Sequence, residues 1–167
     1  MNEQKQLTPK QQKMMARLEI QQAIAQISDT LFEKAQEPAE KLRDAFRKEQ
    51  EKGTTQIRNL ENIAYSTDRL SDIYDFLKKQ MGRPGKLGRQ WRHQGVGQDL
   101  LSTLMDLRRK TRKKDKECKG AREIVEEVRK KYPEGVDEDT ERQVHLMLCR
   151  EYLKHVVAHY LYTGAVK

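Results

Sequence analysis

Length, composition and charge limit the classes of protein to which this chain can belong. Its 167 residues suffice for one domain, and charged residues (36%) slightly outnumber hydrophobic ones (35%). A core made from so few apolar residues has to be narrow, as in a helical bundle. Only four prolines and nine glycines argue against a turn-rich β-sandwich, and the formal net charge is +8 at pH 7.

The sequence also bears on the compartment. No window approaches the run of about 20 apolar residues that spans a membrane. The opening residues, MNEQKQLTPKQQK, lack the apolar segment of a signal peptide. Cys118 and Cys149 are too few and too far apart for a disulfide framework. We therefore expect a cytoplasmic protein with reduced thiols and no membrane contact.

Helical signals begin after a polar stretch, residues 1–7, which predicts a flexible N-terminus. Thr8 and Gln11, with a proline directly after the threonine, have the pattern of a helix N-cap and its capping-box partner. We expect this first helix to end near Ala35, before Pro38. Its apolar residues recur at helical spacing and include Ile20, Ile24, Ile27 and Leu31.

Three more helices are expected in the first half of the chain. The first of them, over 38–51, is highly charged, and its few apolar anchors fit a solvated arm rather than core. Gly53 ends it, and the two threonines that follow cap a helix that buries apolar residues up to Ala64. After a break at 66–68 comes the strongest amphipathic pattern in the chain, which the residues Gly-Arg-Pro at 82–84 terminate.

The stretch from Arg83 to Arg122 carries most of the charge. It holds thirteen Lys or Arg against four Asp or Glu, a balance of +9, whereas the whole chain has +8. Such a concentration is typical of polyanion-binding surfaces. A basic loop, RPGKLGRQWRHQGVG, leads into a helix with Leu100, Leu104 and Leu107 on one face. Away from these leucines we expect a basic stripe that consists of Arg109, Arg112, Lys113 and Lys116.

The remainder of the chain predicts the centre of the fold. Gly120 separates the basic helix from a short piece that ends near Pro133, and acidic residues at 137–139 start the last helix. No segment alternates as a strand does. We therefore predict an all-α fold, a compact bundle of about five to six helices, as a single domain over 8–167 with its basic loop and helix at 83–122. The last helix has the broadest apolar stripe and is expected at the centre: Leu146, Cys149, Leu153, Val156, Val157 and Tyr160.

Side chains with reactive or metal-binding chemistry are few. His155 and His159 lie one helical turn apart, as do His145 and Cys149, which is the spacing of paired metal ligands. The glutamate of a metalloprotease motif is absent, however, and structural roles beside the core stripe are favoured. No phosphate-binding glycine loop, nucleophile elbow or isolated carboxylate pair occurs. We expect no enzymatic activity, no cofactor and no metal site.

The single tryptophan has two roles open to it. Trp91 lies between Arg89 and Arg92 in the basic loop, so its ring could stack on an unpaired base, as aromatic residues do in proteins that bind single strands. It could equally anchor the loop to the helical bundle. The sequence does not distinguish these two interpretations.

Two separated stretches together resemble a known family. The first is GTTQIRNLENIAYS, over 53–66, followed by a helix that ends in QMGR at 80–83; the second is LCREYLKHVVAHYLYTG, over 148–164. They resemble the small helical subunit of type III, Csm-type, CRISPR effector complexes. That family has a TTxQIR-like helix start, a Gly-Arg helix ending and a terminal helix of the form FCRYxEAxVAYHKxYGG. Matching positions in the second stretch are Cys149, Arg150, Val157, His159, Tyr162 and Gly164, with departures at Leu148, Ala158 and Thr163.

The resemblance implies a compact α-helical bundle without catalytic activity. In that family several copies stack beside the repeated backbone subunits and line the channel for target RNA paired to the guide. The expected partners are therefore guide RNA, target RNA, the backbone and large subunits of the complex, and other copies of this chain. Arg58 matches the arginine of the QIR motif and Arg83 that of the Gly-Arg ending, so both are expected to face RNA.

We predict a non-catalytic, RNA-binding structural subunit of a type III CRISPR ribonucleoprotein that acts in antiviral defence. It would hold the guide–target duplex through phosphate contacts, which carry no base information. Apart from the two matched arginines, its RNA-binding residues are assigned by charge. The full set is Lys52, Arg58, Arg83, Arg89, Arg92, Arg109, Arg112 and Lys113.

Two other classes of protein remain open. One is a basic helical adaptor that binds an acidic protein through its Met- and Leu-rich faces. The other is a small helix-turn-helix DNA-binding protein whose reading helix starts at Thr54 or Thr67. Acidic residues on the second of these helices argue against its lying in a DNA groove: Asp68, Asp72 and Asp75.

Overall fold

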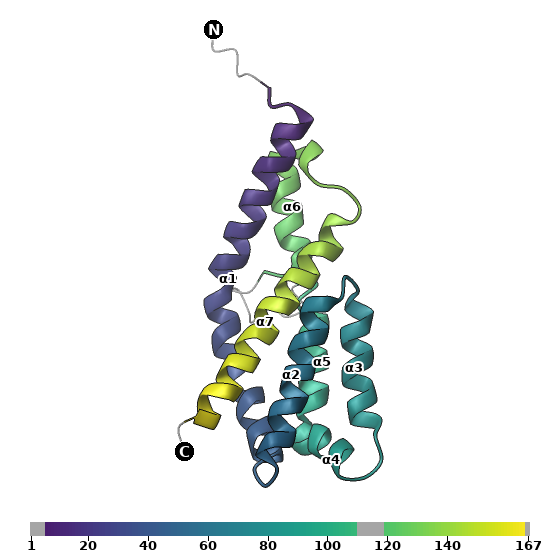
Figure 1. Cartoon of the computed structure of the whole chain (residues 1–167). Coiled ribbons are helices and arrows are strands. Elements are labelled where there is room, and N and C mark those ends of the chain that lie inside the picture. The colour runs from purple at the N-terminus through teal and green to yellow at the C-terminus, as the bar shows by residue number, and fades with distance from the viewer. Residues whose placement is uncertain (1–5, 110–118, 166–167) are drawn as a thin grey trace.

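Two long helices, α1 (Pro9–Ala45) and α7 (Thr140–Ala165), form the axis of the molecule and pack against each other along much of their length (Figure 1). The computed structural model describes residues 6–109 and 119–165, with side chains as far as Tyr162. Within these ranges every regular element is a helix, so the predicted all-α fold is confirmed. In the same part of the chain, no helix combines the length and the apolar character that crossing a bilayer requires.

Helix α1 begins where the sequence predicts but ends later. The Thr8 hydroxyl accepts a hydrogen bond from the Gln11 backbone N–H at 3.2 Å, and the Gln11 side chain accepts one from Thr8 N–H at 2.9 Å. The predicted end near residue 35 is wrong, because the helix continues through Pro38. The predicted solvated arm is wrong as well, since Ala39, Leu42 and Phe46 are fully buried in the common core.

Four shorter helices cover one half of the axis (Figure 1). They are α2 (Gln50–Ser66), α3 (Leu70–Gly82), α4 (Lys86–Arg92) and α5 (Val96–Asp106). Helices α2 and α3 run antiparallel and in contact, and α4 turns the chain back into α5. The predicted end of α3 at its terminal glycine is confirmed.

The junction between α2 and α7 explains a second error in the predicted boundaries. Gly53 does not end a helix; it lies in the first turn of α2. A Cβ atom there would lie 2.1 Å from the Tyr160 hydroxyl and 2.6 Å from Cβ of Phe46, so only glycine allows α2 this close to α7. At the other end of α2, the Arg150 guanidinium donates hydrogen bonds to the backbone carbonyls of Ala64 and Thr67, at 2.9 and 2.6 Å.

The basic helix predicted after the leucines is shorter than expected. Helix α5 ends at Asp106, and the chain is next described at the start of α6 (Ala121–Lys131), which leads into a 3₁₀ turn at Pro133–Gly135. Gly120 directly precedes α6, so the short helix predicted after this glycine is confirmed. Of the predicted basic stripe, Arg109 lies just beyond α5. The other three residues, Arg112, Lys113 and Lys116, lie outside the described residues.

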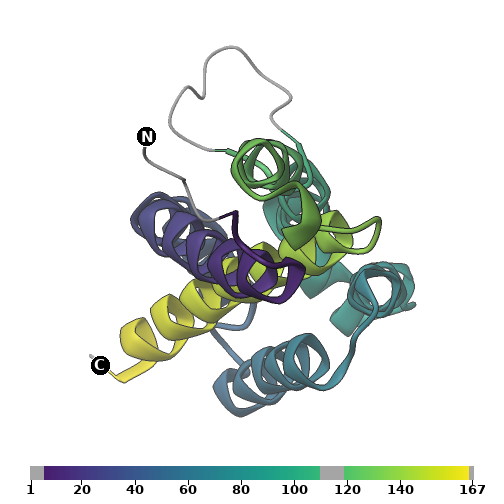
Figure 2. The same cartoon turned by 90° about the horizontal axis from the view of Figure 1, so that it is seen from above.

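Helix α7 is central, as predicted. Seen from above, it passes between α1 on one side and α2 and α3 on the other (Figure 2), and it contacts α1, α2 and α6. Because it has neighbours on several sides, its apolar residues are buried almost all round the helix rather than along one narrow stripe. The buried residues include Val144, Leu148, Cys149, Tyr152, Leu153, Val156, Val157 and Tyr160.

Candidate nucleic-acid interface

The predicted RNA-binding residues do not form one surface. Lys52, Arg83, Arg89 and Arg92 lie around α4, at one end of α5, whereas Arg109 lies beyond the other end of α5. Arg58 is on the outer face of α2, and Arg112 and Lys113 fall outside the described residues. The single basic surface expected over 83–122 is therefore divided into two regions.

In the region around α4, which we call the α4 corner, several cations form hydrogen bonds or ion pairs with other residues of the protein. The Glu49 carboxylate accepts hydrogen bonds from Lys86 Nζ at 2.5 Å, Lys52 Nζ at 3.0 Å and Gln90 Nε2 at 3.2 Å. These bonds, led by that from Lys86, lower the pKa of Glu49 to about 2. The α4 corner is defined by Glu49, Lys52, Lys86, Gln90, Trp91 and Arg92.

Trp91 anchors the α4 corner to the bundle. Its side chain is fully buried, and the indole N–H donates a hydrogen bond to Gln56 Oε1 at 3.2 Å. The ring lies edge-on to Phe46 and Phe76, with centroid distances of 6.4 and 6.1 Å. Of the two roles left open, anchoring is therefore correct, since no face of this ring is open to a base.

The remaining predicted basic residues near α4 differ in whether they already have a partner. Arg92 donates to the backbone carbonyl of Met81, which ties the end of α4 to the end of α3. Arg83 and Arg89, by contrast, are exposed and make no ion pair with any residue that the structure describes. Of the predicted RNA-binding residues near α4, Arg83 and Arg89 are therefore the two whose side chains have no such contact among the described residues.

The outer face of α2 is a third basic site, and a sparse one. The Arg58 side chain is 54% exposed and pairs with Glu61 at 3.0 Å. One and two turns further along lie the exposed Asn62 and Tyr65, and Tyr65 is 53% exposed. An exposed tyrosine on a polar helix face can contact nucleic acid. Tyr65 is not among the predicted site residues, because the amphipathic pattern alone does not separate a surface tyrosine from a core one.

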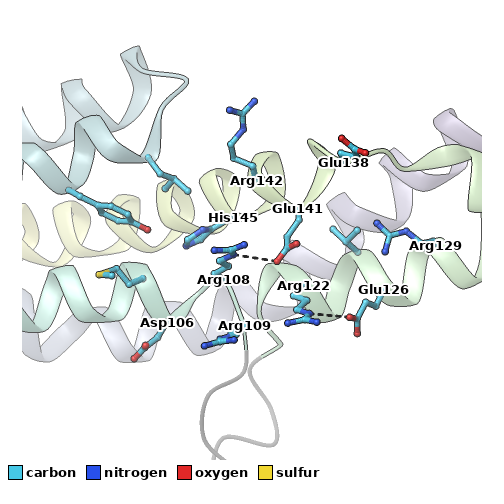
Figure 3. A pocket seen from close by; sticks show the side chains of 14 residues that line it. Asp106, Arg108, Arg109, Arg122, Glu126, Arg129, Glu138, Glu141, Arg142 and His145 are labelled. Carbon is cyan, nitrogen blue, oxygen red and sulfur yellow. Dashed lines mark hydrogen bonds and ion pairs between the residues drawn. The ribbon is translucent and has the colours of Figure 1, made fainter.

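An open groove of about 980 Å³ separates α3 and the end of α5 from α6 and the start of α7 (Figure 3). Its lining includes arginines from three segments of the chain. Only one of these, Arg109, was among the predicted site residues. The spacing of Ile124, Val125 and Val128 predicts an apolar face on 121–131. Arg122 and Arg129 lie three and four residues from Val125, at the edge of that face, and this signal could have revealed both of them. The arginines are Arg108, Arg109, Arg122, Arg129 and Arg142, and we call the cavity the arginine groove.

Ion pairs divide these five arginines into two kinds. Arg108 pairs with Glu141 at 3.5 Å, Arg122 with Glu126 at 3.2 Å, and Arg142 with Asp139 at 3.3 Å. The first two of these pairs are drawn in Figure 3. Arg109 and Arg129 make no ion pair with any residue in the described ranges, and both are exposed. These two guanidinium groups are the ones best placed to receive an anion.

Backbone contacts position Arg109 at the mouth of the groove. Ala121 N–H donates to the Leu107 carbonyl at 2.9 Å, and Arg122 N–H donates to the Arg108 carbonyl at 2.8 Å. A Cβ atom at Gly120 would lie 2.6 Å from Cα of Arg109, so glycine permits this close approach of the two segments. We call this pairing the stem. The intervening sequence, KTRKKDKEC, holds five Lys or Arg against two Asp or Glu.

The floor of the groove is less polar than its mouth. His145 is buried there, and its Nε2 donates to the Leu104 carbonyl at 2.7 Å; the Cys149 thiol lies 3.5 Å from the same oxygen. Burial lowers the pKa of His145, so the neutral ring is favoured near pH 7, and burial raises the pKa of Cys149. Leu70, Tyr74, Met105 and Val125 complete the apolar side of the lining.

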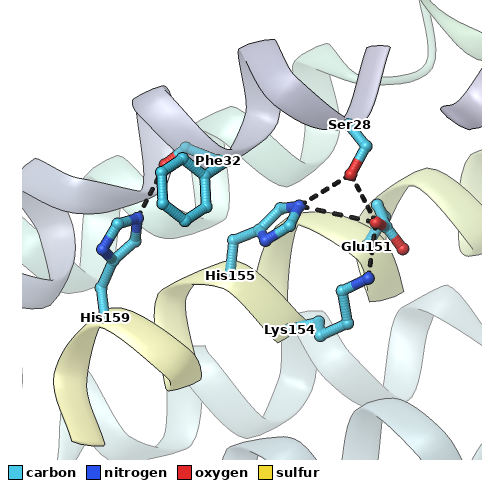
Figure 4. A network of polar contacts seen from close by, with 6 residues as sticks. All are labelled: Ser28, Phe32, Glu151, Lys154, His155 and His159. Atoms are coloured by element: carbon cyan, nitrogen blue, oxygen red, sulfur yellow. Dashed lines mark hydrogen bonds and ion pairs between the residues drawn. The ribbon is translucent and has the colours of Figure 1, made fainter. Parts of the chain in front are cut away.

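A second polar cluster lies between α1 and α7 (Figure 4). Ser28 Oγ donates to Glu151 at 2.6 Å and lies 2.9 Å from Nε2 of His155. His155 uses that same nitrogen toward Glu151, at 3.5 Å, so the arrangement lacks the relay of a catalytic triad, in which the two ring nitrogens have different partners. His159 Nε2 contacts the Phe32 carbonyl at 2.9 Å. Both histidines thus fasten α1 to α7.

Within the described ranges, no three His, Cys, Asp or Glu side chains lie close enough together to hold a metal ion. Comparisons of the chain with protein-family models, with curated proteins and with solved structures find no match. The chemistry of the arginine groove therefore has to be inferred from its own side chains.

Proposed function

We propose that this protein is a non-catalytic RNA-binding subunit of a ribonucleoprotein, of the kind that the resemblance to the type III CRISPR small subunit implies. The observation that carries the proposal is the arginine groove, in which Arg109 and Arg129 have no carboxylate partner among the described residues. An arginine bound to phosphate makes two parallel, charge-assisted hydrogen bonds, which suits this groove to a phosphodiester backbone.

Charge that follows Arg109 in the sequence supports RNA rather than a small anion. The next nine residues, 110–118, include five Lys or Arg against two Asp or Glu. A small anion would not need this surplus, whereas a polymer of phosphates gains affinity from every counterion that it releases. Arg58, Arg83 and Arg89 are exposed on other faces and would contribute further contacts along an extended ligand.

The packing of α2 on α7 supports the resemblance itself. The two resembling stretches meet through Gly53 and Tyr160, and through the bonds from Arg150 to the carbonyls of Ala64 and Thr67. Two stretches that lie far apart in sequence would be retained together if each completes the other's packing.

The partners that we propose are those that the resemblance implies. They are guide and target RNA, the backbone and large subunits, and other copies of the chain, in the cytoplasm.

The helix-turn-helix alternative gains nothing from the fold. Helices α2 and α3 lie antiparallel and side by side (Figure 1), whereas a reading helix crosses its partner at a steep angle so that it can enter the major groove. The adaptor alternative is better addressed by experiment, because an acidic protein would use the same cations as RNA.

Charge reversal in the groove tests the proposal. We expect Arg109→Glu with Arg129→Glu to weaken the binding of two unrelated single-stranded RNAs by more than about tenfold each. The slope of log affinity against log salt should fall by about 1 to 2, because fewer counterions are released. Fluorescence anisotropy over a series of salt concentrations measures both quantities.

The matched control reverses the same amount of charge elsewhere. Arg47→Glu with Lys48→Glu changes two exposed cations at the end of the molecule where α1 joins α2 (Figure 1), and it should alter affinity and salt slope far less. Equal effects of the two double variants would mean that only net charge matters, and would overturn the assignment of the groove. Unchanged RNA binding, together with lost binding to a polyglutamate probe, would favour the acidic-protein adaptor instead.

A further inference from the structure

The arginine groove has an apolar wall as well as a cationic one, and a phosphate backbone alone does not account for it. Met105 lines the groove and is 53% exposed, although it is a large hydrophobic side chain. Tyr74, which lines the same groove, is only half-buried, and its hydroxyl makes no hydrogen bond with any residue that the structure describes. Leu70, from the first turn of α3, extends the same wall.

The positive and negative charges that line the groove nearly balance. Net charge alone therefore does not select a ligand, and contacts with particular side chains have to do so. Five arginines face four carboxylates, those of Asp106, Glu126, Glu138 and Glu141. Two of the carboxylates are occupied by Arg108 and Arg122. A ligand that fits would place an anionic group at Arg109 or Arg129 and a flat, weakly polar group against the apolar wall.

One unit of a nucleic acid has both of these parts. A base that is paired and stacked in a duplex has both faces covered by its neighbours, whereas an unpaired base exposes a face that can stack on an aromatic ring. The volume of about 980 Å³ lies within the range of pockets that enclose small molecules, so it has room for a base and its sugar.

We infer that the arginine groove holds one unpaired nucleotide of an RNA strand, with its base against Tyr74 and Met105 and its phosphates at Arg109 and Arg129. This inference rests on the proposed function and adds to it the conformation of the bound RNA. The Tyr74 hydroxyl then donates to the base or the ribose. Burial raises the pKa of Tyr74 to about 12, which keeps that hydroxyl protonated throughout the neutral range.

An RNA strand without bases distinguishes the contribution of this stacking contact to affinity from that of the phosphate contacts. We would measure by anisotropy the affinity of the full chain for an oligouridylate and for a strand of equal length with abasic riboses. Stacking on aromatic side chains contributes about 1–3 kcal/mol per base, so the wild-type protein should prefer the intact strand by roughly 5- to 150-fold. Tyr74→Leu keeps an apolar side chain but removes the ring, and should lose most of that preference.

Two further variants make the result specific. Tyr65→Leu removes an exposed tyrosine from α2, outside the groove, and should keep the wild-type preference. Met105→Ser changes an exposed residue and is not expected to affect folding, so it tests the apolar wall even if circular dichroism shows that Tyr74→Leu is misfolded. It should reduce the preference for the intact strand without changing the salt slope.

The possible failures are distinguishable. If wild type, Tyr74→Leu and Met105→Ser discriminate equally between intact and abasic strands, the nucleotide site is wrong. The proposed function survives that result as long as reversal of Arg109 and Arg129 still weakens both strands. If this reversal leaves both affinities unchanged, RNA does not bind in the groove, and both proposals are overturned.

Discussion

The α4 corner and the arginine groove are both rich in cations, yet they use them in opposite ways. At the corner, the single carboxylate of Glu49 accepts hydrogen bonds from two lysines and a glutamine, and a buried tryptophan fixes the loop. In the groove, two arginines lack carboxylate partners among the described residues. The corner contains more of the residues predicted to bind RNA, but its own cations, Lys52, Lys86 and Arg92, already have partners.

The difference shows that charge density along a sequence is a poor guide to a binding surface. A lysine whose ammonium group already donates to a carboxylate would have to give up that contact before it could bind phosphate. A guanidinium without an ion pair gives up only its hydration. The number of partners that each cation already has, which only the fold determines, therefore decides which basic residues are free to bind an anion.

The largest expected effect is at the corner. Trp91→Ala should lower the free energy of unfolding by about 3–5 kcal/mol, because it leaves a cavity between Phe46 and Phe76 and deprives Gln56 of a donor. Urea denaturation followed by circular dichroism measures this loss. Trp91→Phe should cost less, since it retains part of the ring. A loss below about 1 kcal/mol for the alanine variant would mean that Trp91 is not an anchor.

A smaller loss is expected where an arginine has a structural role. Arg150→Ala removes the donors to the carbonyls of Ala64 and Thr67, and should reduce stability by about 1–3 kcal/mol. Arg129→Ala in the groove removes no such contact and should stay within about 0.5 kcal/mol of wild type. Thermal unfolding of the two variants gives the comparison, and equal losses would contradict the distinction between bound and free arginines.

Acid should weaken the hydrogen bonds of the α4 corner. Because the pKa of Glu49 is lowered to about 2 in the folded protein, its carboxylate stabilises the fold above the ordinary pKa of 4.5. That stabilisation is lost as the pH falls from about 4.5 to 2. The melting temperature of wild type should therefore fall more steeply across this window than that of Glu49→Gln. Parallel curves for the two proteins would show that the three hydrogen bonds add nothing measurable.

The smallest effect on stability is expected on α2. Arg58→Ala removes one exposed ion pair with Glu61, and such pairs contribute about 0–1 kcal/mol. The melting temperature should be almost unchanged, while RNA capture by an assembled ribonucleoprotein should weaken if Arg58 faces the ligand. Electrophoretic mobility of the complex with labelled RNA checks the second part, and Glu61→Ala serves as the control for loss of the ion pair alone.

Local signals in the sequence predict the fold well where neighbours along the chain decide the structure. The capping box at Thr8 and the glycine that ends α3 are both observed as expected. Pro38 and Gly53 misled the prediction because distant packing outweighs their local preferences. Helix α1 continues through Pro38 because the burial of Ala35, Ala39 and Leu42 on either side offsets the free-energy cost of a proline inside a helix. Helix α2 includes Gly53 because its close contact with Tyr160 leaves no space for a side chain there.

The site was harder to predict than the fold, for a physical reason. The arginines of the groove come from three segments, and Arg129 and Arg142 lie outside the basic stretch altogether. Helical spacing indicates which face of α6 they share, but no local pattern shows that this face meets the end of α5. Likewise, the sequence contains Glu49 and Lys86 at positions 37 residues apart, with nothing to indicate that they pair.

The stem has a consequence for how this protein can change. Backbone bonds from Ala121 to Leu107 and from Arg122 to Arg108 hold the end of α5 against the start of α6. Lengthening a chain between two fixed ends is inexpensive, since each doubling of a flexible segment costs only about 0.6 kcal/mol. Insertions in the sequence between the two sides of the stem should therefore leave the groove intact, which offers a position for a grafted peptide or fluorophore.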